Sequence, residues 1–114
     1  MARFEALITP VVDGDLLRDG LEQIAQEWGG ILTWLDSRNA SLDLVSGGLQ
    51  VKLLLELRSG DALLLLVTSR EGMGAGAPRT LGLLEELLIG IAECVPQSRV
   101  VFRSDRDGPI RHKP

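Results

Sequence analysis

A chain of 114 residues holds one domain with a sizeable core, but it is too short for a complete two-half dinucleotide-binding domain or a barrel enzyme. The net charge is −4, and residues 1–98 carry 7 basic and 14 acidic side chains, which argues against broad contact with nucleic-acid phosphates. Cys94 is the only cysteine and His112 the only histidine, so an intramolecular disulfide and a Cys/His zinc site are both excluded.

Hydropathy and charge also restrict where the protein works and what it binds. No apolar run reaches the roughly 18 residues that cross a bilayer, and the start MARFEALITPVV lacks the layout of a signal peptide. An acidic body suits a basic target. We therefore expect a cytoplasmic protein with no membrane partner, no nucleic-acid partner, no metal and no cofactor.

The first third of the chain has the pattern of a strand, a helix and a second strand. The segment RFEALIT alternates apolar and polar residues as a strand does, and Pro10 marks its end. Apolar residues then recur at helical spacing from Leu17 to Trp28, with Asp13 or Asp15 able to cap the first turn. A glycine pair ends this helix, and ILTWLD follows as a second strand.

The middle of the chain predicts further strands, and a helix and a strand close it. SLDLV and LQVKLLLELR alternate, and a tight turn separates the second from ALLLLV, whose unbroken apolar run predicts a central strand covered on both faces. The pattern TLGLLEELLIGIAECV predicts a second helix that begins at a capping Thr80 and ends before Pro96. RVVFRSD supplies the last strand.

This order predicts an α+β fold, a two-layer sandwich with two helices on one face of a mainly antiparallel sheet. A strand-helix-strand unit at each end is the split βαβ arrangement, so we expect a ferredoxin-like topology enlarged by an extra β-hairpin. Residues 1–103 are expected to form the single domain. Residues 104–114 are expected to be a flexible basic tail, because they are short and polar and contain glycine and two prolines.

The segment TSREGMGAGAPRT, residues 68–80, resembles a phosphate-binding glycine loop in its letters. Its glycines and Ala77 fit G-x-G-x-x-[GA] between a strand and a helix, but the loop comes late in the chain and Pro78 displaces its last small residue. We therefore expect a connector. An anion site, and with it a small-ligand sensor or an acyl- or nucleotide-binding protein using residues 72–77, is the alternative. Its candidate residues are Arg70, Gly72, Gly74, Gly76, Arg79 and Thr80.

No catalytic constellation stands out. Ser69 is the only serine at a strand-to-helix turn, and its base would have to be His112 from the tail. Carboxylates such as Glu85 and Glu86 are most simply a solvated helix face. We therefore expect no enzymatic activity.

The remaining signal is apolar surface. The second helix is apolar over nearly two thirds of its circumference, and several strand residues are expected on the sheet face away from the helices. Either the loop and tail cover these residues or they form an interface with a protein partner or a second copy. The expected interface residues are Trp34, Leu54, Leu83, Leu87 and Ile89. The sequence thus predicts a non-catalytic, acidic protein-binding domain of the immunity or inhibitor, adaptor or chaperone type.

Overall fold

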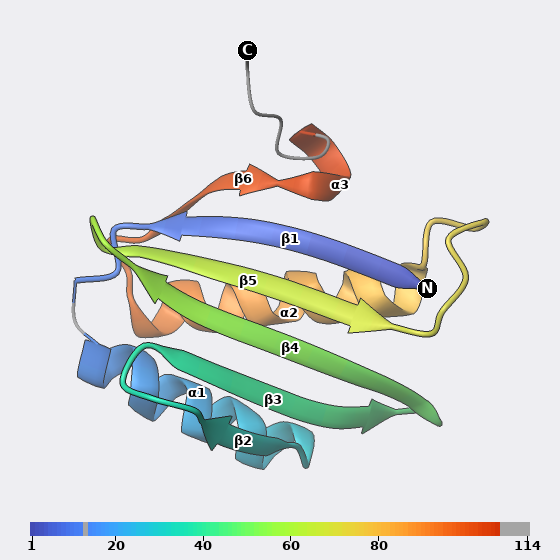
Figure 1. Ribbon diagram of the computed structural model, residues 1–114, viewed down its shortest axis with the longest axis horizontal. Coiled ribbons are helices and arrows are strands. Elements are labelled where there is room, and N and C mark those ends of the chain that lie inside the picture. Colours follow the sequence, from blue (N-terminus) through green and yellow to red (C-terminus); the bar gives the residue numbers. More distant parts are fainter. Residues whose placement is uncertain (13, 108–114) are drawn as a thin grey trace.

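A computed structural model describes residues 1–12 and 14–107 of the chain (Figure 1). The main elements follow the predicted order, with four strands between the two long helices. They are β1 (Ala2–Thr9), α1 (Gly14–Trp28), β2 (Ile31–Trp34), β3 (Asn39–Ser46), β4 (Leu49–Arg58), β5 (Ala62–Ser69), α2 (Pro78–Cys94), β6 (Arg99–Arg103) and α3 (Ser104–Asp107).

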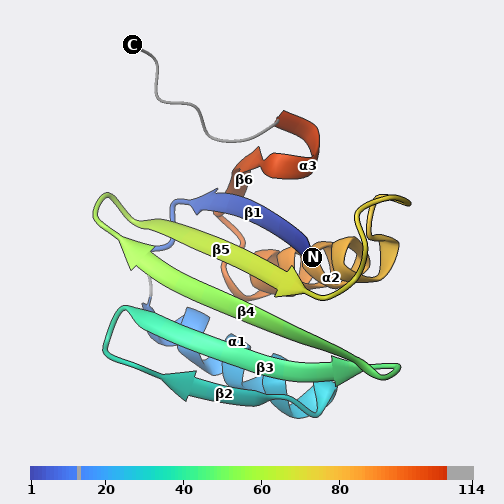
Figure 2. The same ribbon diagram turned by 45° about the vertical axis from the view of Figure 1, so that its right-hand side comes forward.

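The six strands form one antiparallel sheet in the order β2-β3-β4-β5-β1-β6. Figure 1 shows α1 and α2 together behind one face of this sheet, and the turned view in Figure 2 keeps them on that side. The predicted α+β class is therefore confirmed. The helix α2 connects β5 to β6, and β1 lies between these two strands.

The core lies between the sheet and the helices and is almost entirely aliphatic. Alternate residues of each central strand point into it, as in the burial of Phe4, Ala6 and Ile8 along β1. The strand β5 is central, as expected, but its residues alternate between buried and half-buried. The expectation that β5 is covered on both faces is wrong, because the described residues place helices on one face only.

The two long helices approach each other closely through glycine residues. A Cβ atom added to Gly20 of α1 would lie 2.2 Å from Sγ and 2.9 Å from Cβ of Cys94 on α2. A Cβ atom on Gly90 of α2 would lie 2.8 Å from Cδ1 of Ile24. The wide apolar stripe of α2 is therefore used inside the molecule, since one side of it packs on the sheet and another on α1.

Secondary structure continues past residue 103, where the domain is expected to end. Residues Ser104–Asp107 form the short helix α3, which packs against β1 and β6. The Ser104 hydroxyl accepts a hydrogen bond from the Glu5 backbone N–H at 2.8 Å, and the Asp107 carboxylate accepts one from the Arg103 N–H at 2.8 Å. The first four residues of the expected flexible tail are thus part of the fold. The rest of that tail, residues 108–114, lies outside the described residues.

The close helix contact makes Gly20 the position where a methyl group costs most. Replacing Gly20 with alanine is expected to lower the free energy of unfolding by about 1–3 kcal/mol, because the Cβ of Cys94 is fixed to its backbone and cannot rotate away. Gly82 is the matched control in α2, since nothing lies within 4 Å of a Cβ added there. Gly82→Ala is expected to raise stability by about 0.5–1 kcal/mol through helix propensity. Urea unfolding measures both, and a stabilising Gly20→Ala would contradict the helix packing.

Candidate functional site

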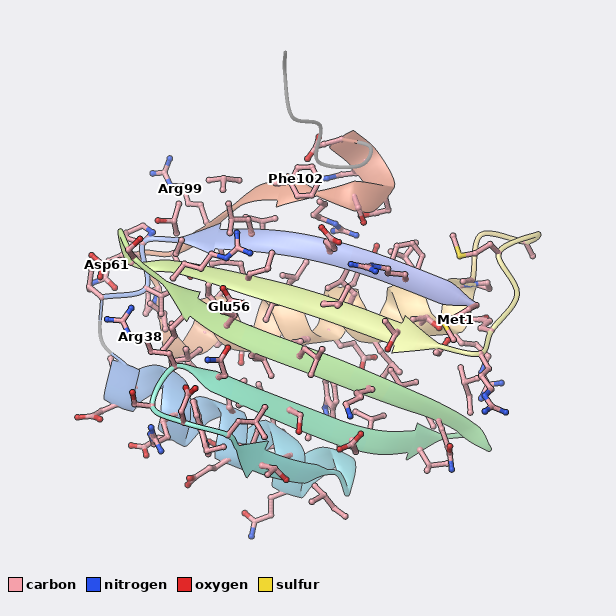
Figure 3. The ribbon with its side chains drawn as sticks, viewed as in Figure 1. Met1, Arg38, Glu56, Asp61, Arg99 and Phe102 are labelled. Atoms are coloured by element: carbon pink, nitrogen blue, oxygen red, sulfur yellow. The ribbon has the colours of Figure 1, made fainter. Side chains whose placement is uncertain are left out.

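The face of the sheet turned away from the helices carries a band of apolar side chains. The strand register aligns these residues in two rows across the sheet. One row passes through Ser41, Leu54, Leu66 and Glu5, and the other through Asn39, Glu56, Leu64, Leu7 and Phe102. Figure 3 shows the labelled Glu56 and Phe102 on this open face. The leucines of both rows therefore form one continuous surface over β4, β5 and β1.

A groove of about 300 Å³ lies on this surface near the β2–β3 turn. Leu35, Leu54, Leu64 and Leu66 line it, together with the polar residues Asp36, Asn39 and Glu56. Leu35 is 66% exposed and Leu54 38% exposed, so apolar area remains in contact with water. An exposed apolar groove on a small domain is typical of a protein-binding or ligand-binding surface.

The turn beside the groove is held rigid by Asp36. Its carboxylate accepts hydrogen bonds from the backbone N–H groups of Arg38 and Asn39 and from the Asn39 side chain, at 2.7 to 3.0 Å. The hydrogen bond from the Arg38 N–H, followed by that from the Asn39 side chain, lowers the pKa of Asp36. Asp36 thus fixes the conformation of this turn, and the turn places Leu35 at the groove.

The five expected interface residues do not form one surface. Leu54 lies on the open sheet face, as predicted. Ile89 is 61% exposed on α2, in a groove of the helix layer, and Leu83 is half-buried against the core. Leu87 is fully buried, so its expected place on a surface is wrong, because α2 is covered by the sheet on one side and by α1 on another.

Trp34 lies on the opposite side of the sheet from the one expected. The β2–β3 register pairs Trp34 with Ala40 and Leu32 with Leu42, which are both buried beneath the helices. The Arg18 guanidinium stacks 4.1 Å from the centre of the Trp34 ring. Trp34 Nε1 is buried and has no hydrogen-bond partner among the described residues. Its placement on the open face is therefore corrected to a groove between β2 and α1.

The glycine-rich connector supplies the cap of α2, through Glu71. The helix begins at Pro78, with Ala77 as N-cap residue, so the expected capping role of Thr80 is wrong. The Glu71 carboxylate accepts hydrogen bonds from the backbone N–H groups of Arg79 at 3.1 Å and Thr80 at 2.8 Å, and from the Thr80 hydroxyl at 2.7 Å. These are N–H groups that a helix leaves unpaired in its first turn. The Glu71 carboxylate thus occupies the place at the N-terminus of α2 where an external anion would bind.

The other candidate anion ligands are directed elsewhere. The Arg79 guanidinium donates to the backbone carbonyls of Ser46 and Gly47 in the β3–β4 turn. Arg70 lines a different, open hollow together with Lys52 and Asp43. Of the loop glycines, only Gly76 has a positive φ, and no atom lies within 4 Å of a Cβ added to Gly72, Gly74 or Gly76. The structure does not bring Arg70 and Arg79 together around these glycines.

Hydrogen bonding controls the protonation of Glu71. Desolvation raises the pKa of Glu71, but the hydrogen bonds from Thr80 and Arg79 and the positive charge of Arg79 outweigh it and hold the pKa below its ordinary value of 4.5. The ionised form is the better acceptor for the N–H groups of α2. The cap is therefore complete at neutral pH.

The nucleophilic side chains in this region are engaged in structural contacts. The Ser69 hydroxyl lies 2.6 Å from the Thr80 hydroxyl, and it accepts a hydrogen bond from the Glu71 N–H at 3.1 Å. Burial raises the pKa of the Cys94 thiol, and the charge of Glu93 raises it further. His112, the base that a Ser69 nucleophile would require, lies outside the described residues. Within residues 1–12 and 14–107, no group of His, Cys, Asp or Glu is placed to hold a metal ion.

Neither a protein-family model nor a curated protein matches this sequence. Among the helices of the described segments, none combines the length and the apolar character needed to cross a membrane. The geometry of the site therefore carries the functional argument.

Glu71 makes the free energy of unfolding depend on pH in the acidic range. Because its pKa is lowered in the folded state, its contribution is present above pH 4.5 and is lost as the pH falls below that value through the folded pKa. Replacing Glu71 with glutamine is expected to lower stability at neutral pH and to reduce the further loss between about pH 5 and about pH 3. Urea unfolding across this range tests it, with Glu86→Gln on the exposed face of α2 as control. Equal acid sensitivity in wild type and Glu71→Gln would contradict the cap.

The internal cap also predicts how the connector responds to phosphate. Millimolar phosphate or ATP is expected to leave the melting temperature of the wild-type chain unchanged, because Glu71 holds the N–H groups that an anion would need. Thermal unfolding with and without each anion, at matched ionic strength, measures this. A concentration-dependent rise in Tm that disappears in a Gly74→Ala, Gly76→Ala double variant would restore the anion-site alternative.

Proposed function

We propose that this chain is a non-catalytic protein-binding domain of the inhibitor, adaptor or chaperone type, and that another protein covers the open face of its sheet. The observation that carries the proposal is the apolar groove lined by Leu35, Leu54, Leu64 and Leu66. Apolar area is the main source of affinity in protein association. The partner is expected to fill the groove with aliphatic or aromatic side chains.

The surroundings of the groove support a protein rather than a small molecule. The groove is formed largely by leucines of neighbouring strands, and the charged residues Asp36 and Glu56 line it beside them. An apolar centre within a polar rim is the usual anatomy of a protein interface. A small ligand is more often enclosed in a deeper pocket.

Several contacts support the absence of catalysis. The hydroxyls of Ser69 and Thr80 and the carboxylate of Glu71 bond to one another and to the first turn of α2. Cys94 packs beside Gly20 with a raised pKa, which disfavours the reactive thiolate. These groups stabilise the fold, so we assign them no part in a reaction.

For the fold itself, we propose the ferredoxin-like class. The placement of β1 between β5 and β6, with α2 as the connection, supports the split βαβ unit at the carboxyl end. The hairpin of β3 and β4, which lies between β2 and β5, is then the enlargement. This assignment leaves the proposed binding surface unchanged.

The proposal predicts which surface leucine matters. Leu54→Lys is expected to weaken partner binding at least about tenfold, since a central apolar contact is lost and a charge enters the interface. Ile89→Lys, on the helix layer, is the matched control, because both residues are exposed and gain the same charge. Proteins retained from a lysate by immobilised wild-type chain are identified, and the affinity of each purified candidate for the three forms is measured by calorimetry.

Two outcomes would contradict the sheet-face interface. A partner that is lost with Ile89→Lys but kept with Leu54→Lys would move binding to the helix layer. A particle of at least twice the 12.4 kDa chain mass in light scattering, which reverts to one chain in Leu54→Lys, would mean that a second copy covers the face.

A further inference from the structure

The strand β2 is an open edge of the sheet, and its shortness, four residues, is the one common protection against pairing that it has. It is the terminal strand of the order, and its segment ILTW contains no charged residue and no proline. Natural edge strands are commonly protected by charges, prolines or bulges. The opposite edge, β6, shows such features, because Arg99 and Arg103 bound it and a register shift interrupts its pairing with β1.

The backbone of β2 has hydrogen-bonding groups directed outward. The Leu35 N–H donates to the Asn39 carbonyl at 2.8 Å. The backbone N–H and C=O groups of the odd-numbered residues in this segment therefore point toward β3. In an antiparallel pair, hydrogen-bonding groups of successive residues point to opposite sides. The N–H and C=O groups of Leu32 and Trp34 therefore point away from β3, and they are a template for one more strand.

A groove of about 800 Å³ runs beside this edge, between β2 and α1. Its wall on the sheet is formed by Leu32 and Trp34, and the Arg18 guanidinium lies 4.1 Å from the centre of the Trp34 ring. Its wall on the helix is polar, formed by Asp19, Glu22, Gln23 and Gln26. A strand added to β2 would thus place alternate side chains between an aromatic surface and a row of carboxylate and amide groups.

The charge of this wall identifies the partner's chemistry. Asp19 and Glu22 are exposed, and neither makes an ion pair within the described part of the chain. The helix layer as a whole is acidic, since α1 and α2 together carry seven carboxylates and two arginines. Basic side chains on an added strand would meet these carboxylates.

We propose that β2 accepts an extended segment of another protein as an additional strand. The alternate side chains of this strand that face α1 are basic, with their stems packed on Leu32 and Trp34 and their charges directed to Asp19 and Glu22. The apolar side chains between them lie beside Ile31 and Thr33 on the other face of the sheet. Backbone hydrogen bonds to the edge supply affinity, and the alternate side chains supply selectivity. This surface is distinct from the open-face groove. Its existence therefore does not depend on the partner proposed above.

A second copy of this chain fits the same edge less well. A two-fold axis through Thr33 would match Ile31 with Leu35 of the other copy, which are both exposed and apolar. The same axis would bring α1 of each copy, which runs along β2, toward its counterpart. Asp19 and Glu22 would then approach the identical carboxylates, so like charges would meet where a basic peptide brings opposite ones.

The test uses arrayed, terminally blocked octapeptides with valine, isoleucine or leucine at alternate positions and arginine, glutamate or serine between them. Binding of the fluorescently labelled full chain is expected to favour arginine peptides over glutamate peptides. For a binding peptide, N-methylation of one alternating set of amides is expected to abolish binding, while methylation of the other set is tolerated. Only alternate amides of an added strand face the edge, so this asymmetry is the signature of strand addition.

Variants of the chain locate the binding. The double variant Asp19→Lys, Glu22→Lys is expected to bind the arginine peptide with an affinity at least about tenfold lower, measured by fluorescence polarisation. Glu86→Lys with Glu93→Lys on α2 is the matched control, because it changes the net charge equally and should have a much smaller effect. Leu54→Lys should leave peptide binding unchanged, which separates this site from the open-face groove.

Several results would overturn the proposal. They include no binding by any arrayed peptide, preference for glutamate, equal effects of the two methylation patterns, and equal effects of the two charge-reversal pairs. A dimer of the free chain that dissociates in Ile31→Lys would also overturn it, because a second copy would then occupy the edge.

Discussion

The handedness of the two helical connections determines which surfaces of this molecule remain free. The connections β1-α1-β2 and β5-α2-β6 each join two strands that run in the same direction but are not neighbours in the sheet. The two connections cross the sheet in opposite directions. Crossovers of this kind are almost always right-handed. Here β1 and β5, the first strands of the two connections, are antiparallel, and the connections cross the sheet in opposite directions. Under these two conditions, two right-handed crossovers place their helices on the same face, as Figure 1 shows. The other face is left without a helical layer.

This one-sided cover gives the two faces of the sheet different surfaces. The helix layer carries seven carboxylates and two arginines, and the open face carries half-buried leucines such as Leu64 and Leu66 next to charged residues such as Glu5 and Glu56. The edge strand β2 lies where these two surfaces meet, so one of its sides is close to the carboxylates of α1 and the other to the open face. A single small domain therefore offers two surfaces that suit different partner chemistry.

Local patterns predicted the elements, but contacts between elements decided most of the site. Alternation and helical spacing are properties of neighbouring residues, and all the predicted strands and both long helices are present. The surface positions of Trp34 and Leu87 depend on strand register and on how α2 packs with α1, which periodicity does not contain. The apolar circumference of α2 exceeds what one sheet face covers, as expected, and α1 covers a further part of it.

The glycine-rich connector shows why a motif needs its surroundings. The spacing of its glycines suggests phosphate binding, because a helix N-terminus presents unpaired N–H groups to an anion. Here the anion is Glu71, which lies seven residues before the helix begins, and no local spacing rule links a carboxylate at that distance to the first turn. The positive φ of Gly76 lets the connector fold back so that Glu71 reaches these groups. The connector that resembles a phosphate loop therefore supplies an anion of its own, the Glu71 carboxylate, to the first turn of α2.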